Sequence, residues 1–228
     1  MEVSNQNYMD EAVFKEVRKK GLLAFGVTGG ILPIALAILG SIIYKADANG
    51  ELGVISMFPA LFCMFIFIYD CFILFEKISQ HTNSKIYSIF KSWFFSLIAI
   101  IISGMIMFAY VSKFGDKIAV AFMIIFCIFI IIAIYKWIRL FIELKNLSDE
   151  KLFLIYVILL AISFILGFAT IFLTYAILFG GFSFLGGLIK FVGMFDTIGA
   201  ILPIISFVLL ILAWYRVKYF KVLPKLED

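Results

Sequence analysis

The amino-acid sequence predicts an all-α fold, a polytopic membrane helix bundle with about six transmembrane helices. Hydrophobic residues make up 64% of the chain and charged residues only 15%. Apolar runs of about 20 residues, the length that crosses a bilayer as a helix, recur along the sequence. Soluble domains are nearer half apolar. Hydrocarbon is therefore the expected solvent for most of this chain.

The predicted helices follow the apolar runs in order. These runs span about 21–44, 53–75, 92–112, 118–135, 151–179 and 196–214. Before them, residues 1–20 are polar and form either a short helix on the inner surface or a frayed terminus, and residues 217–228 form a polar tail. Residues 180–195 are too rich in glycine for a firm helix and too apolar for a free loop. We expect them to lie in the outer interface or to form a re-entrant segment.

Small residues mark one face of the first, fifth and sixth runs. In membranes such residues let two helix backbones approach closely. The predicted helix-packing positions are Gly26, Gly30, Pro33, Ser163, Gly167, Gly199 and Pro203. The pattern fits packing within the chain and packing between chains equally well.

Basic residues predict which way the bundle is oriented. Of the 19 Lys and Arg residues, all but four lie beside the N-terminal segment, the second and fourth connections or the C-terminal tail. The exceptions are Lys45, Lys113, Lys117 and Lys190. Because basic residues concentrate on the cytoplasmic side, we expect both termini in the cytoplasm and the bundle in the cytoplasmic (inner) membrane. The three tryptophans fall at the same predicted boundary, as interfacial anchors do.

Asp70 is the residue whose placement in the second run costs free energy. It lies two helical turns before Lys77, where its short side chain cannot easily reach water. It must therefore face other protein or a wet cavity, or carry a proton. One hypothesis is that Asp70 binds a proton or small cation. The alternative is that Asp70 is hydrogen-bonded to a serine or tyrosine, or pairs with a basic residue at the inner boundary.

Asp196 is the second candidate ion site. It precedes Thr197 at the predicted start of the sixth run, where an aspartate is well placed as a helix N-cap. We favour this capping role over ion binding. The predicted orientation puts Asp196 near the outer edge and Asp70 in the inner third, so the two are not expected to form a carboxylate pair.

The C-terminal part of the chain resembles a known group of proteins. The resemblance is carried by Asp149-Glu150-Lys151-Leu152-Phe153 and by Leu209-Leu210-Ile211-Leu212-Ala213-Trp214, and it covers about a third of the chain. The group is an uncharacterised family of small prokaryotic multi-pass membrane proteins. It has no established activity, so the resemblance implies the membrane topology and transfers no site residues. The bias toward Phe, Ile and Lys is typical of a low-GC bacterial source.

The residue types in the apolar runs argue against several function classes. Cys63, Cys71 and Cys127 all lie in these runs without CxxC spacing, and His81 is the single histidine. We therefore expect no metal site and no cofactor. The basic residues lie beside apolar runs rather than in a separate domain, which favours contact with lipid headgroups over nucleic acid. The sequence has no hydrolase or phosphate-binding motif, so we expect no enzyme.

Two function classes remain. The first is a non-enzymatic membrane scaffold or accessory subunit, in which small-residue faces pack against another membrane protein or a second copy of the chain. The alternative is a small transporter or channel for a proton or small cation that uses Asp70. The lipid bilayer is the expected partner in both.

Overall fold

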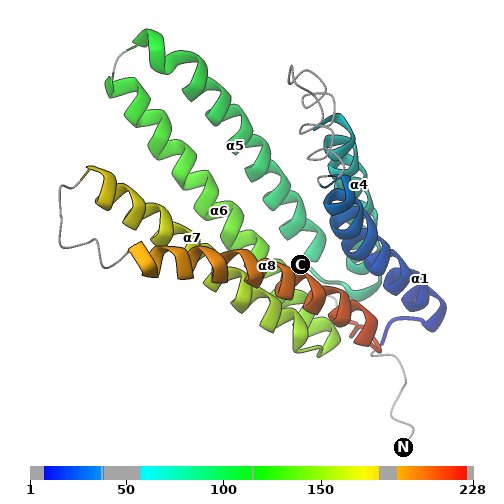
Figure 1. Ribbon diagram of the computed structural model, residues 1–228. Helices are drawn as coiled ribbons and strands as arrows, with labels where there is room; N and C mark the ends of the chain where they lie inside the picture. The colour runs from blue at the N-terminus through cyan, green and yellow to red at the C-terminus, as the bar shows by residue number, and fades with distance from the viewer. Residues whose placement is uncertain (1–7, 37, 39–56, 115, 180–188, 225–228) are drawn as a thin grey trace, which may run out of the picture. The chain divides into compact units, whose positions relative to one another are not determined.

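The computed structural model describes residues 8–36, 38, 57–114, 116–179 and 189–224. Within these ranges the chain is helical apart from short connections, the ends and one isolated β-bridge (Figure 1). The predicted all-α fold is confirmed. The chain divides into two compact units, Met1–Asp149 together with Val217–Asp228, and Glu150–Arg216.

Unit 1 holds the N-terminal helices. Helix α1 (Glu11–Leu22) continues directly into a π-helical segment, η1 (Leu23–Ile31). Three long helices follow: α4 (Met57–Thr82), α5 (Ile86–Phe114) and α6 (Asp116–Ser148). Both α1 and η1 pack on α4, α4 packs on α5, and α5 packs on α6.

Unit 2 is a helical hairpin of α7 (Leu152–Phe179) and α8 (Ile189–Arg216). The two helices run antiparallel, because residues early in α7 meet residues late in α8. The ring of Phe153 packs edge-on against Trp214, with centroids 5.5 Å apart. Just before α7, the Glu150 carboxylate lies 3.7 Å from Arg216 and accepts a hydrogen bond from the backbone N–H of Leu152.

Five helical stretches are long and apolar enough to cross a membrane, counted over the described residues. They are Glu11–Leu36, Ile86–Ile106, Ile124–Ser148, Leu152–Thr170 and Thr197–Arg216. These match five of the six predicted spans, so the chain is a membrane protein with several apolar helices. The second predicted span corresponds to α4, which has 26 residues. It is not among the five because its C-terminal half carries three charged residues, Asp70, Glu76 and Lys77, and only the described residues were counted.

The helices extend beyond the apolar runs from which the spans were predicted. Most of the second predicted connection is helix, because α4 continues to Thr82 and α5 starts at Ile86. The 33-residue α6 likewise includes the basic residues predicted to follow its span. Apolar character marks only the part of a helix that lies in hydrocarbon, whereas helical hydrogen bonding continues into the polar interface.

The core of unit 1 includes a closed ring of six aromatic side chains. Each member contacts the next at a centroid distance between 4.5 and 6.2 Å, and Trp93 with Trp137 is the closest pair. In order, the ring is Phe25, Phe75, Phe90, Trp93, Trp137 and Phe141. Its members come from η1, α4, α5 and α6. Edge-on and tilted aromatic pairs add roughly 0.5–1.5 kcal/mol each beyond area burial. The ring therefore fixes four elements relative to one another.

Residues 217–224, here called the C-terminal strap, lie across one end of unit 1. The strap accepts a backbone hydrogen bond from Met9 at Phe220 O (2.9 Å). Phe220 is fully buried and its ring packs edge-on against Phe14. The strap thus joins the chain segment before α1 to the ends of α4 and α6.

The strap also satisfies carbonyl groups at two helix C-termini. The backbone N–H of Lys221 donates to Leu147 O (2.8 Å), and that of Leu223 donates to Thr82 O (2.9 Å). Each helix is followed directly by a residue with positive φ, Asn83 after α4 and Asp149 after α6. Asn and Asp tolerate this left-handed conformation better than most residues. The last carbonyls of a helix have no partner within it, so the strap replaces water at both ends.

The side chain of Asp149 also binds the strap. Its Oδ2 lies 2.6 Å from Lys221 Nζ and accepts a hydrogen bond from Tyr219 OH (2.8 Å). These two contacts hold the pKa of Asp149 below its ordinary value of 3.8. The Asp149 carboxylate in turn raises the pKa of Lys221 above 10.5. The contribution of this ion pair to stability is therefore complete above pH 3.8 and below pH 10.5.

We predict that the rate of hydrogen–deuterium exchange at the strap amides depends on pH in the way that these two pKa values require. Exchange of the Lys221 and Leu223 amides, corrected for intrinsic rates, should stay constant between the limits. It should accelerate as pH falls through the lowered pKa of Asp149. Asp149→Asn should abolish this acid step, whereas Glu11→Gln, which removes only the exposed i,i+4 pair with Lys15, should leave it unchanged. An unaltered acid step in Asp149→Asn would contradict the assignment.

Candidate functional site

The candidate site lies where η1 packs on α4 and is centred on Asp70. Asp70 is half-buried and its Oδ2 lies 3.3 Å from the Oγ1 of Thr28, across the two elements. Thr28 is 8% exposed. Of the alternatives open from the sequence, hydrogen bonding to a hydroxyl is the one observed, and the partner is a threonine rather than a serine or tyrosine.

The lysine nearest in sequence to Asp70 has another partner. Lys77, two turns further along α4, pairs with Glu16 of α1. The same glutamate lies 3.8 Å from Lys20. Within the described residues no salt bridge involves Asp70, so the expected alternative of a basic partner at the inner boundary is not observed.

The local backbone of η1 explains how Thr28 reaches Asp70. A π-helix is wider than an α-helix because its N–H groups donate to the carbonyl five residues back, and such turns are frequent at functional sites. The segment contains Gly29 and Gly30 and ends two residues before Pro33. Glycine is a poor helix former and proline lacks an N–H, so the regular α-helical pattern is weak here.

Gly29 is required by a close approach to α4. A Cβ atom at this position would lie 2.7 Å from the ring of Phe67 and 2.8 Å from Ala24 O. Phe67 also packs edge-on against Phe25 of the aromatic ring, with centroids 5.6 Å apart. The close contact at Gly29 thus sets the distance between η1 and α4 beside Thr28.

The other predicted packing residues of the first span also lie at this interface or near it. Gly26 and Gly30 are buried, and Pro33 is half-buried. The GxxxG spacing points to Gly26 and Gly30, and Gly29, which that spacing does not include, also has no room for an added Cβ.

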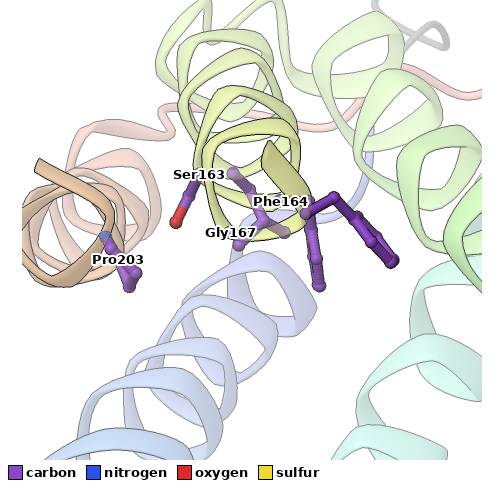
Figure 2. A pocket seen from close by; sticks show the side chains of 6 residues that line it. Ser163, Phe164, Gly167 and Pro203 are labelled. Carbon is purple, nitrogen blue, oxygen red and sulfur yellow. The ribbon is translucent and has the colours of Figure 1, made fainter. Parts of the chain in front are cut away.

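In unit 2 the predicted packing residues gather on the hairpin. The Oγ of Ser163 donates to Gly199 O across α7 and α8 (3.3 Å). Figure 2 shows the Ser163 hydroxyl pointing toward the helix that carries Pro203, while Phe164 points away from it. Gly167 and Pro203 line a cavity of about 480 Å³, and an added Cβ at Gly167 or Gly199 would meet no atom within 4 Å. A methyl group at either position would therefore meet open space, although Gly199 O accepts the hydrogen bond that joins the two helices.

Asp196 is not a helix N-cap. The backbone is already helical from Ile189, so Asp196 lies about two turns inside α8. An N-cap requires non-helical backbone with free N–H groups after it, which this position lacks. Of the predicted interfacial or re-entrant segment 180–195, residues 189–195 belong to α8 and residues 180–188 lie outside the described residues.

Thr28 was not predicted from the sequence, although comparing how deep residues of the first and second spans lie in the membrane would have indicated it. Thr28 lies eight residues after Lys20, and Asp70 lies seven residues before Lys77. In two antiparallel helices whose basic residues share one boundary, these positions lie at similar depth. A threonine in an apolar run does not by itself indicate a site, because its hydroxyl can hydrogen-bond to a carbonyl of its own helix.

No group of three His, Cys, Asp or Glu side chains that could hold a metal ion occurs in the part of the chain that the structure describes. Comparisons with protein-family models, curated proteins and solved structures found no match. The family resemblance noted from the sequence therefore remains an expectation.

We predict that Gly29→Ala destabilises unit 1 and that Gly167→Ala does not. The added methyl at position 29 must displace Phe67 or the backbone, and such overpacking costs about 1–3 kcal/mol. At position 167 the methyl meets open space, and alanine is the better helix former. Thermal unfolding in detergent should show a lower midpoint for Gly29→Ala only. Equal midpoints for the two variants would contradict the close approach at Gly29.

Proposed function

We propose that this protein is a multi-pass protein of the cytoplasmic membrane with both termini in the cytoplasm. The strap supports this topology because it brings together the segments that the basic residues assign to one side. Met9, Thr82, Leu147 and the strap itself meet through backbone hydrogen bonds. These residues belong to the N-terminal segment, the second and fourth connections and the tail, which the charge distribution predicts to share the cytoplasmic face.

We further propose that the protein is a non-enzymatic scaffold or accessory subunit. The strap is the observation that carries this proposal. The strap contacts α1, α4 and α6 or the residues next to them through its side chains and backbone. These contacts join four separate segments into one polar surface. The exposed faces of the long helices, by contrast, are largely apolar. Such a division suits a protein that holds a shaped surface at the membrane for another membrane protein or a second copy of itself.

This proposal predicts that a discrete complex depends on the strap. Phe220→Ala should remove the buried anchor of the strap at a cost of about 3–5 kcal/mol. Native gels of solubilised source membranes should show a complex heavier than the monomer for the wild-type chain. That complex should be lost in Phe220→Ala and kept in Leu223→Ala, whose side chain is 38% exposed. Expression and protease resistance of the helices serve as fold controls. A wild-type chain that cross-linking in intact membranes finds only as a monomer would overturn the scaffold proposal.

The second candidate function is a small transporter or channel for a proton or small cation. The contact between Asp70 and Thr28 favours it, because an acid and a nearly buried hydroxyl meet between two helices of the membrane domain. An ionisable residue at such a position is a functional candidate by default. In this function the side chain of Asp70 binds the ion and the packed faces of η1 and α4 line its access.

Reconstituted liposomes test this second candidate. We predict proton or cation flux above that of empty liposomes for the wild-type chain. Asp70→Asn should reduce it to the level of empty liposomes, because the amide cannot bind and release a proton. Glu76→Gln, a matched change at an exposed position of the same helix, should retain it. Wild-type liposomes without flux would exclude this candidate.

A further inference from the structure

The backbone carbonyl of Gly199 in α8 lacks its ordinary helical donor. In an α-helix this oxygen would accept a hydrogen bond from the N–H four residues later. That residue is Pro203, which has no N–H and whose ring crowds the same carbonyl. Helix α8 nevertheless continues through Pro203 to Arg216. In hydrocarbon a carbonyl freed in this way needs another partner, and a hydroxyl of a neighbouring helix can supply one.

Ser163 of α7 supplies that partner. Its Oγ donates a hydrogen bond to Gly199 O across the hairpin, at 3.3 Å. Figure 2 shows the hydroxyl directed toward the helix that carries Pro203. The bond is longer than the usual 2.5–3.0 Å between a hydroxyl and an oxygen. It is therefore weaker than a bond of ordinary length, and less free energy is needed to open it.

Other hydroxyls of the hairpin bond to their own helix. Thr170, Thr197 and Ser206 each donate to the carbonyl four residues before them, at 2.7–2.9 Å. This is a common arrangement for serine and threonine inside a helix. Ser163 has a carbonyl at the same spacing, that of Leu159, but its hydroxyl reaches across to α8 instead. Two acceptors are thus within the reach of one donor.

The hairpin is densely packed at one end only. At that end Phe153 and Trp214 are fully buried and their rings are in contact. No described side chain is buried in residues 158–170 of α7 or in residues 193–205 of α8. The cavity of about 480 Å³ lies in this loosely packed part, against Pro203. Side-chain packing within the hairpin therefore leaves α8 room to bend at the proline.

We propose that Ser163, Gly199 and Pro203 form a latched hinge in α8. In the closed state the Ser163 hydroxyl bonds to Gly199 O and holds α8 against α7. In the open state the same hydroxyl bonds to Leu159 O of its own helix, and α8 bends at Pro203. The closed state is favoured, because opening deprives Gly199 O of this donor. The hinge lies within unit 2, and its action requires neither proposed function to be correct.

A double-mutant cycle tests whether the hydroxyl replaces the missing N–H. Ser163→Ala should lower the ratio of folded to unfolded protein about threefold, the average effect of a hydrogen bond between membrane helices. In a Pro203→Ala background position 203 has an N–H again, so Ser163→Ala should have little effect there. Reversible unfolding in mixed micelles measures both ratios. The control Ser206→Ala removes a hydroxyl that bonds to its own helix and should have equal effects in the two backgrounds. Equal effects of Ser163→Ala in the two backgrounds would overturn the latch.

Selective isotope labelling observes the latch and the hinge separately. The sequence has one Gly-Ala pair, Gly199-Ala200, so glycine labelled with ¹³C at the carbonyl and alanine labelled with ¹⁵N give one NMR signal for this peptide bond. Ser163→Ala should move the Gly199 carbonyl signal upfield, because the carbonyl loses its donor. It should also accelerate solvent exchange of the Ala200 amide, because α8 opens beside it.

Ser163→Thr is the matched control, since it keeps the hydroxyl and the cavity leaves room for the added methyl. It should show the wild-type carbonyl shift and the wild-type exchange rate. An unchanged carbonyl shift in Ser163→Ala would overturn the latch. A changed carbonyl shift with unchanged exchange of the Ala200 amide would overturn the hinge, because the hydrogen bond would then be lost without bending of α8.

Discussion

The aromatic ring at the strap end of unit 1 is the constraint on which the rest of that unit depends. It joins η1, α4, α5 and α6 through six side chains, so none of these elements can shift along another without breaking a ring contact. Such packing matters more in a bilayer than in water, because lipid tails are as apolar as the helices and provide no hydrophobic drive for helix association. Shape complementarity must supply the specificity instead.

The polar contacts of unit 1 follow from this arrangement. Phe25 anchors η1 in the ring, and Phe67 packs over Gly29 one turn away. These two aromatic contacts fix the rotation of η1 against α4, and the rotation in turn brings Thr28 to Asp70. The π-helical backbone is therefore part of the site, since it sets which face of η1 the acid meets.

Much of the fold could be predicted from the sequence because the bilayer imposes a simple length rule. Five of the six predicted spans have matching helices, and the residues assigned to one side meet at the strap. The helix ends could not be predicted, because α4 and α6 stop before Asn83 and Asp149, whose positive φ is backbone geometry that hydropathy does not encode. Asp196 was wrongly predicted as a cap because helix α8 begins before its apolar run. Asp70 could be identified because an aspartate in hydrocarbon costs free energy. Thr28 carries no such cost, and its contact with Asp70 depends on tertiary packing.

The strap also constrains the order in which the protein matures. Its backbone donors complete the ends of α4 and α6, yet the ribosome makes residues 217–224 only after all the long helices. Until then the carbonyls of Thr82 and Leu147 are hydrated, and Phe14 lacks the ring that covers it. The strap can therefore complete these two helix ends only after α7 and α8 have been synthesised, which makes its docking a late step in the maturation of unit 1.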